Sequence, residues 1–295
     1  MATASKPARL DVRKTYKLYI GGDFPRSESG RSYPATDHKG TVLARVAQGS
    51  RKDLRDAVRI ARKAQPGWAS RTGYNRAQIL YRIAEMVEDR ADVFSTHLKA
   101  GGLTANQAKR EVNQSIERLV WYAGWGDKFA QVMGNLNPVS GPFFNISAPE
   151  PSGVVGTIAP ESPALLGLVS RLAPAIIIGN TSVLLASERW PLPAITFAEA
   201  LATADVPGGV VNILTGPKRS LIPVLAAHMD INVIDAFGHT HEDAADIETK
   251  ASDSVTRVVR PCREGFPWDD DGVARSPYMI AEFAEIKTVW HPKGT

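Results

Sequence analysis

The sequence predicts an α/β fold in which a parallel sheet of about five strands follows a mainly helical region. From residue 153 onward, short apolar runs alternate with segments of helical length, which is typical of a parallel sheet with both faces covered. Before that point, apolar residues recur at helical spacing. The length of 295 residues and the hydrophobic content of 43% are enough to bury a substantial core.

The first half is expected to hold two short strands and three long helices. A Gly-Gly pair inside an alternating stretch favours a hairpin turn, and a serine before an apolar row is a suitable N-cap. The expected elements are strands over residues 17–24 and 41–47, a helix that Ser50 caps and Pro66-Gly67 ends, and helices over residues 75–93 and 106–129.

The second half carries the sheet. Residues 134–153 are rich in Pro, Gly, Asn and Ser, which favours an extended connector or hairpin. Ligands of parallel sheets bind at the C-terminal ends of the strands, so the turns after the strands are the candidate site. The expected strands are residues 154–158, 182–185, 210–214, 233–236 and 256–259, and the expected helices are residues 165–178, 192–204, 219–229 and 241–252.

Composition argues against several functional classes. The 35 basic and 31 acidic residues are interspersed and leave a formal net charge of +4, so we expect no nucleic-acid groove. The longest apolar stretch, residues 172–179, is far shorter than the ~20 residues that span a bilayer, so we expect no membrane partner. A single cysteine, Cys262, permits no internal disulfide, which favours the cytoplasm.

Short motifs for common cofactors are missing. The sequence has no G-x-G-x-x-G after a strand, no Walker A motif, no H-E-x-x-H and no C-x-x-C. His239 and His241 favour a helix start or surface position over a metal site, and the aspartates at 269–271 lack the spacing of a calcium loop. We therefore expect no metal site.

Several separated motifs share one family resemblance. GVVGTIAPESPALL, LAPAIIIGNTSVLLASE and VPGGVVNILTG, together with LYIGGDF and WYAGWGDKF, keep the order and spacing of the coenzyme-binding domain of aldehyde dehydrogenases. The resemblance covers residues 16–260, and YMIAEFAEIKTVWHP is similar to the last strand of that family's oligomerisation arm. The catalytic domain between them has no counterpart here. The chain thus resembles the non-catalytic second unit of two-domain aldehyde dehydrogenases.

The resemblance implies a Rossmann-like core with additions on both sides. The implied domains are a flexible arm at residues 1–15, a helical part at 16–133, oligomerisation-arm strands at 134–152 and 276–292, the Rossmann-like core at 153–260, and a linker at 261–275 in place of the catalytic domain.

The same resemblance implies which residues would contact NAD or NADP, and these are Pro160, Ser162, Glu188, Gly216, Gly238 and Thr240. Three departures from the family pattern weaken that site. Ser162 stands where the family has an asparagine that stabilises an oxyanion, and Leu185 replaces a ribose-binding lysine. Glu242 and Asp243 lie at the phosphate-proximal helix, where they compete with anions unless they simply cap that helix. NAD or NADP binding is therefore possible but weakened, and neither is required.

No catalytic residue is expected. Cys262 does not occupy the family's nucleophile position, and Glu264 lies near the general-base region without a nucleophile to serve. The alternative is a reactive thiol, because Arg260 and Arg263 could lower the pKa of Cys262.

The leading functional hypothesis is a partner or scaffold subunit of a full-length aldehyde dehydrogenase. We expect residues 280–290 to form a strand whose free edge pairs with that enzyme, with another copy of this chain, or with both. The alternatives are an NAD(P)-dependent oxidoreductase acting on aldehydes, a nucleotide-binding sensor, and a gene relic that folds but does little.

Overall fold

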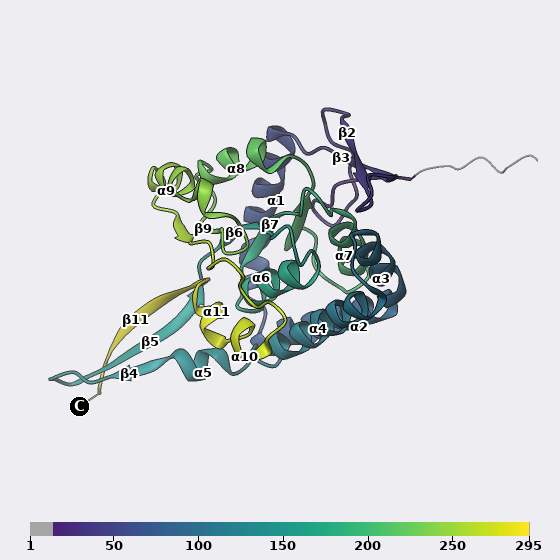
Figure 1. The fold of residues 1–295 in the computed structure, drawn as a ribbon. Coiled ribbons are helices and arrows are strands. Elements are labelled where there is room, and N and C mark those ends of the chain that lie inside the picture. The colour runs from purple at the N-terminus through teal and green to yellow at the C-terminus, as the bar shows by residue number, and fades with distance from the viewer. Residues whose placement is uncertain (1–13, 295) are drawn as a thin grey trace, which may run out of the picture.

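The structure is a computed structural model that describes residues 14–294 (Figure 1). Most of the predicted flexible arm, residues 1–13, therefore lies outside the described residues. Thr15–Tyr16 forms the short strand β1, which pairs in parallel with β3 (Val42–Ala47), and β2 (Ser32–Thr36) pairs with the other edge of β3. Among the described residues, no helix is both long and apolar enough to cross a membrane.

A five-stranded parallel sheet forms the centre of the body, which confirms the predicted fold class. Its strand order is β10-β9-β6-β7-β8, so the chain adds β7 and β8 on one side of β6 and then crosses to add β9 and β10 on the other. The strands are β6 (Val154–Ile158), β7 (Thr181–Leu185), β8 (Val211–Leu214), β9 (Val233–Asp235) and β10 (Arg257–Val259).

Helices cover both faces of this sheet because its strands are apolar on both sides. Val183 and Leu185 pack with residues of the first helical layer, whereas Leu184, which points the other way, packs with the second. The first layer holds α1 (Arg51–Ala69), α8 (Lys218–Ala226) and α9 (Ala244–Ser252), and the second holds α6 (Leu166–Ile177) and α7 (Leu192–Leu201) (Figure 1).

The two longest helices before the sheet begin at side-chain caps. Ser50 and Asp53 form a capping box on α1, and Thr104 and Gln107 form another on α4. The helical region packs outside α6 and consists of α2 (Gly73–Asp89), α3 (Ala91–Ala100), α4 (Ala105–Ala123) and α5 (Phe129–Met133).

Three predicted helix boundaries were wrong. α1 continues through Pro66 because Trp68, which is 2% exposed, donates from Nε1 to the Ile176 carbonyl at 2.8 Å and holds the last turn against α6. The helix predicted over residues 75–93 breaks at Arg90, after which α3 turns Phe94 into the core. The helix predicted over residues 106–129 ends at Ala123, where Gly126 packs so closely on α2 that an added Cβ would lie 2.6 Å from the Gly73 carbonyl oxygen.

The Gly-Gly turn formed as predicted but the strand around it did not. Gly21 and Gly22 both have positive φ, and Ile20 and Asp23 exchange backbone hydrogen bonds of 3.0 and 3.1 Å across them. Tyr19 makes only an isolated antiparallel bridge, to Ile213 of β8.

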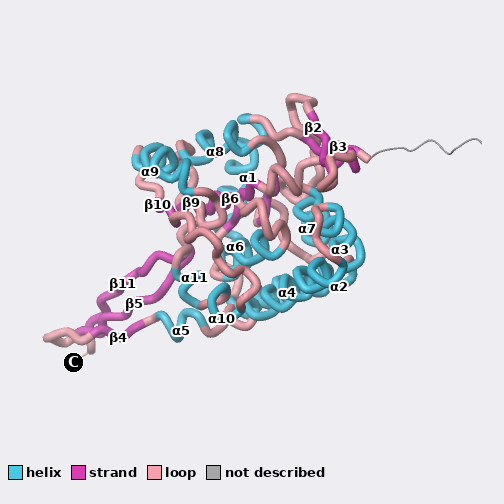
Figure 2. Tube along the Cα trace, viewed as in Figure 1, coloured by secondary structure: helices cyan, strands magenta, loops and turns pink. Residues whose placement is uncertain are grey.

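A three-stranded antiparallel sheet projects from the body as an arm (Figures 1 and 2). It has the order β11-β5-β4 and consists of β4 (Asn135–Asn137), β5 (Phe143–Pro151) and β11 (Ala284–Pro292). The strand predicted over residues 280–290 therefore begins later. Ser276 caps the short helix α11 (Pro277–Ala281), which buries Ile280 completely before the strand starts.

The segment between β10 and the arm packs against the body. It contains α10 (Asp271–Ala274) and is fastened by Arg118 of α4, which is 0% exposed. The guanidinium donates to the Ala274 carbonyl at 2.9 Å, the Trp268 carbonyl at 3.1 Å and the Asp271 carboxylate at 2.8 Å. The sequence predicts a linker at residues 261–275. Hydrogen bonds from the charged Arg118 side chain hold part of this segment on the body.

Candidate functional site

The predicted site residues all follow the C-terminal ends of strands in the parallel sheet. Pro160 and Ser162 come after β6, and Glu188 comes after β7. Gly216 comes after β8, while Gly238 and Thr240 come after β9. Because parallel strands end at one edge, the fold places these turns along the same side of the sheet, where ligands of such sheets bind.

The turn after β7 is bound by a carboxylate from the turn after β6. Ser187 donates from Oγ to Glu161 Oε2 at 2.8 Å, and the backbone N–H of Arg189 donates to the same oxygen at 2.9 Å. The N–H of Glu188 donates to Glu161 Oε1 at 3.2 Å. Glu161 therefore lies against the turn after β7, which carries the predicted ribose-binding residue Glu188.

A lysine that follows β8 contacts the carboxylates of both Glu161 and Glu188. Lys218, the first residue of α8, is 6% exposed and its ammonium contacts the Glu161 carboxylate and donates to the Ala159 carbonyl at 2.6 Å. The backbone N–H of Lys218 donates to Glu188 Oε2 at 2.9 Å. We call Glu161, Ser187, Glu188 and Lys218 the carboxylate cluster.

The electrostatics of the carboxylate cluster favour an ionised Glu161. Burial alone would raise the pKa of Glu161, but the Lys218 ammonium and the hydrogen bonds from Lys218, Arg189 and Ser187 outweigh it and lower the pKa from its ordinary value. Tyr33 lies beside the cluster. Burial, followed by the charges of Glu188 and Glu161, raises the pKa of Tyr33, and its buried hydroxyl has no hydrogen-bond partner among the described residues.

This ionisation links the cluster to stability. Since the pKa of Glu161 is lower in the folded chain than its ordinary value of 4.5, Glu161 stabilises the fold above about pH 4.5 and loses this effect as the pH falls through the folded pKa. We expect Glu161→Gln to be less stable than the wild type at neutral pH, and the difference to shrink in acid. Urea unfolding of both proteins from neutral pH to acid measures this. A difference that does not change with pH would contradict the ion pair.

The edge is tightly packed at the point where the strand order reverses, between β6 and β9. A Cβ added to Gly238 would lie 2.6 Å from Pro160 Cδ and 3.2 Å from the Ile158 carbonyl oxygen, so the two turns are in contact. Phe237, next to Gly238, has its ring centroid 5.0 Å from that of Phe266 and 5.7 Å from that of Trp268. The segment after β10 thus covers this turn with aromatic rings.

Ser162 is exposed and lies beside a small cavity of about 40 Å³ that Glu111 and Trp190 also line. Buried Glu111 accepts hydrogen bonds from the backbone N–H groups of Leu165 at 2.9 Å and Leu166 at 3.2 Å, and so fixes the turn that presents Ser162. A cavity of this size holds about one water molecule and no larger ligand.

The departures that the sequence singled out have separate structural roles. Leu185 is 1% exposed and belongs to the core below the edge. Thr240 and Glu242 are exposed at the short 3₁₀ helix η1 (His241–Asp243), and Asp243 contacts His239 Nε2 at 2.8 Å. Asp243 occupies the N-cap position of α9, as the capping interpretation expects, but its side chain makes no cap hydrogen bond there.

Comparison with known proteins decides the family. Residues 26–261 match the model of the aldehyde dehydrogenase family. The chain belongs to this family. It is 30% identical to the mitochondrial benzaldehyde dehydrogenase of Antirrhinum majus over 97% of this chain and 52% of that protein. It is 33% identical to the putative aldehyde dehydrogenase DhaS of Bacillus subtilis over 84% of this chain and 50% of that protein.

Solved structures of the family share the fold. HpcC from Thermus thermophilus has a TM-score of 0.80 and 28% identity over 84% of this chain and 48% of its own. The NAD⁺ complex of an aldehyde dehydrogenase from Bacillus cereus has a TM-score of 0.77 and 25% identity over 83% of this chain and 50% of its own. The chain spans about half the length of the aldehyde dehydrogenases that it matches.

Cys262 lacks the surroundings of a reactive thiol. Burial raises the pKa of Cys262, against the opposing charge of Arg171. Arg260, which the sequence suggested as an activating charge, donates instead to Glu248 at 2.6 Å. His241 contacts the Cys262 carbonyl oxygen at 3.0 Å. The expectation that Arg260 lowers the pKa of Cys262 is therefore wrong.

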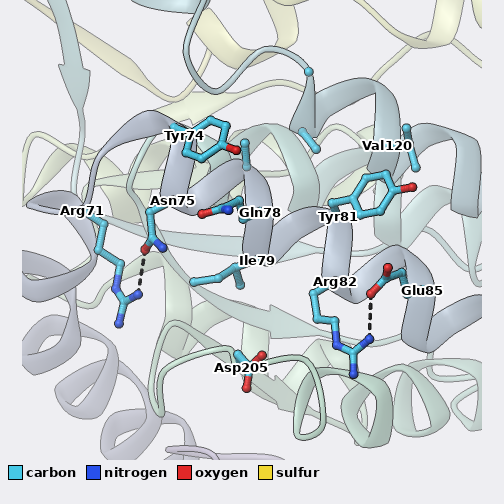
Figure 3. Close-up of a pocket in the computed structure, with 13 residues that line it drawn as sticks. Arg71, Tyr74, Asn75, Gln78, Ile79, Tyr81, Arg82, Glu85, Val120 and Asp205 are labelled. Atoms are coloured by element: carbon cyan, nitrogen blue, oxygen red, sulfur yellow. Dashed lines mark hydrogen bonds and ion pairs between the residues drawn. The ribbon is translucent and has the colours of Figure 1, made fainter.

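A groove lies away from the sheet edge, on α2 and α4 (Figure 3). It measures about 890 Å³ and is lined in part by Tyr74, Tyr81 and Val120, with the ion pair between Arg82 and Glu85 along it. The residues of this chain that were predicted to contact NAD or NADP do not line this groove.

Sequence reasoning missed the residues that define the edge. It gave no role to Glu161, Lys218 or Glu111. Glu161 and Lys218 are 57 residues apart in the sequence, and Glu111 is 54 residues from its partner Leu165. A carboxylate in the turn after β6, combined with a lysine two residues after Gly216, was the available signal. Both follow strands that were predicted correctly.

Proposed function

We propose that this chain is a non-catalytic member of the aldehyde dehydrogenase family that acts as a partner or scaffold subunit of a full-length aldehyde dehydrogenase. The observation that carries the proposal is the uncovered apolar face of the arm. The proposal also keeps the expected cytoplasmic location, which rests on the single cysteine.

One face of the arm presents an apolar row across all three strands. Leu136 of β4 pairs with Ile146 of β5, which pairs with Val289 of β11, and these side chains are 68%, 48% and 50% exposed. Cross-strand neighbours of this kind form one continuous surface. The arm projects from the body (Figure 1), and the described residues leave these three side chains exposed. Exposed apolar patches of this form mark interaction sites.

The opposite face of the arm combines a hydrogen-bonded polar group with exposed apolar side chains such as Trp290. Asn137 donates to Asn145 at 2.6 Å and to Ser147 at 2.7 Å, and the Ser147 and Thr288 hydroxyls lie 2.8 Å apart. These bonds fix the register of the three strands, so the apolar row is presented on a rigid support. The unpaired edge of β11 adds backbone groups that a neighbouring strand could pair.

The chemistry near the sheet edge supports a non-catalytic role. Burial raises the pKa of the single cysteine despite the opposing charge of Arg171, and Arg260 is paired with Glu248 instead. Ser162 is exposed and makes no described side-chain hydrogen bond. A thiolate nucleophile needs an activating base or positive field, and an oxyanion needs fixed donors.

We expect the purified chain to form a stable complex with a full-length aldehyde dehydrogenase of the same organism at micromolar concentration. Replacing Ile146 and Val289 together by threonine keeps β-branched side chains and removes the apolar surface. We expect this double variant to bind roughly tenfold or more weakly. Size-exclusion chromatography with light scattering, followed by titration calorimetry, measures the complex and its dissociation constant.

The matched control is Met229→Thr, which removes an apolar side chain that is 85% exposed but lies off the arm. It should bind like the wild type, and circular dichroism should show all proteins folded. Self-association of the chain, lost in the double variant, would support the arm with a second copy as partner. A chain that stays monomeric beside the full-length enzyme would overturn the proposal.

The rival candidate is an NAD(P)-dependent oxidoreductase acting on aldehydes. It is favoured by the structural similarity to a Bacillus cereus aldehyde dehydrogenase whose structure is an NAD⁺ complex. Reduction of NAD⁺ by the purified chain with a panel of aldehydes would establish this candidate. Calorimetric binding of NAD⁺ without turnover would instead establish a nucleotide-binding sensor.

A further inference from the structure

We propose that Glu161 acts as an internal ligand, whose carboxylate fills the crevice at the C-terminal ends of β6, β7 and β8 and closes it to a dinucleotide. This inference concerns the chain's own sheet edge and does not depend on the arm or on any partner.

The contacts around Glu161 are those of a bound anion. Its two oxygens accept hydrogen bonds from the Ser187 hydroxyl at 2.8 Å and from the backbone N–H groups of Glu188 and Arg189 at 3.2 and 2.9 Å. The Lys218 ammonium supplies the positive charge. Charge-assisted hydrogen bonds from a lysine and oriented backbone amides are a common way in which proteins bind carboxylates and phosphates.

Burial makes this arrangement difficult to open. Lys218 is only 6% exposed, so moving Glu161 away would leave a buried ammonium with one neutral partner, the Ala159 carbonyl. Loss of the counter-charge of a buried ammonium is unfavourable, and here the ammonium is the buried partner, since the Glu161 side chain is 43% exposed.

The residues present do not fit NAD or NADP. Glu188, expected to bind a ribose, already accepts from the Lys218 N–H, and Leu185, at the position of the expected lysine, lies in the core. Pro160 and Gly238 are in contact where the strand order reverses. A dinucleotide would therefore have to displace Glu161 and also separate the turns after β6 and β9.

Removing the Glu161 side chain should leave a vacant site for a small anion. The donors that remain are one hydroxyl, two backbone N–H groups and one ammonium, all directed at the volume of a single carboxylate. The matching ligand class is a small monocarboxylate, and acetate reproduces the lost group atom for atom.

The test is whether acetate restores the thermal stability of Glu161→Ala, with the unfolding temperature Tm as the measured quantity. We expect Glu161→Ala to lower Tm by roughly 5 °C and about 100 mM acetate to restore at least half of this loss. Sodium chloride at equal ionic strength should restore none of it, and acetate should leave the wild type unchanged because Glu161 already fills the site. If Glu161→Ala does not fold, NAD⁺ and NADP⁺ calorimetry on the wild type tests the closure directly.

Two controls separate the site from general salt effects. Glu161→Ala combined with Lys218→Met should not respond to acetate, because the ammonium that pairs with the anion is gone. The wild type should give no binding heat with NAD⁺ or NADP⁺ up to roughly millimolar concentration. Absence of rescue in Glu161→Ala, or dinucleotide binding by the wild type, would overturn the inference. Neither result bears on complex formation through the arm.

Discussion

Replacing Arg171 by methionine is expected to lower the free energy of unfolding by about 3–5 kcal/mol, because it leaves a buried carboxylate without its counter-charge. Arg171 and Asp235 are both 0% exposed. The guanidinium donates from Nε to Asp235 Oδ2 at 2.9 Å and from Nη2 to Oδ1 at 2.9 Å. Without it, the described partner of the Asp235 carboxylate is the Phe237 N–H at 3.2 Å. Urea unfolding at neutral pH measures the loss.

The same guanidinium joins three parts of the chain, so the effect should be global. Arg171 belongs to α6 and Asp235 ends β9, and Nη2 also donates to Glu282, just before the arm, at 2.7 Å. The guanidinium carbon lies 4.3 Å from the ring centroid of Phe237 and 5.1 Å from that of Phe283. Methionine can fill much of this apolar space but cannot supply the charge.

A second variant separates charge from packing. Adding Asp235→Asn to Arg171→Met removes the uncompensated charge and keeps the side chain's size. We expect the double variant to be more stable than Arg171→Met alone by about 1–2 kcal/mol. Equal stability of the two variants would mean that lost packing, and not the buried charge, accounts for the effect.

The fold could be predicted from the sequence because its dominant patterns are local. The strands at residues 154–158 and 182–185 are continuous apolar runs between turn residues, and such runs fix a buried strand wherever they lie in a parallel sheet. The boundaries at Pro66 and Ile280 could not be predicted in this way. In each case a distant contact, of Trp68 with α6 or of Ile280 with the core, outweighs local preference.

The positions of the predicted site residues in the fold follow from the sequence, but their contacts do not. Pro160, Glu188 and Gly238 lie at the C-terminal edge of the sheet because each comes shortly after a strand. The sequence could not reveal that Glu161 and Lys218 meet, because their pairing depends on how the turns after β6 and β8 approach one another. Ion pairs between distant turns have no periodic signal in a single sequence.

Replacing Arg118 by methionine is expected to release the segment between β10 and the arm. Arg118 makes four hydrogen bonds, to Ser170, Ala274, Trp268 and Asp271, at distances between 2.7 and 3.1 Å. Three of them hold residues 268–274 on the body. Hydrogen bonds to a charged group contribute about 1.5–3 kcal/mol each and are not additive, so we expect a loss of about 2–4 kcal/mol. Chymotrypsin should then cleave after Trp268 at least roughly tenfold faster.

The matched control for this prediction is Arg275→Met. Arg275 contacts the same Asp271 carboxylate, at 3.2 Å, but its side chain is 30% exposed and that of Arg118 is fully buried. Because solvent screens the Arg275 pair, we expect its loss to cost less than about 1 kcal/mol and to leave cleavage nearly unchanged. The two variants remove one positive charge each from one carboxylate, so a difference between them isolates the role of the buried arginine. Equal cleavage in both would show that Asp271 alone, and not the hydrogen bonds from Arg118 to the segment's backbone, holds it in place.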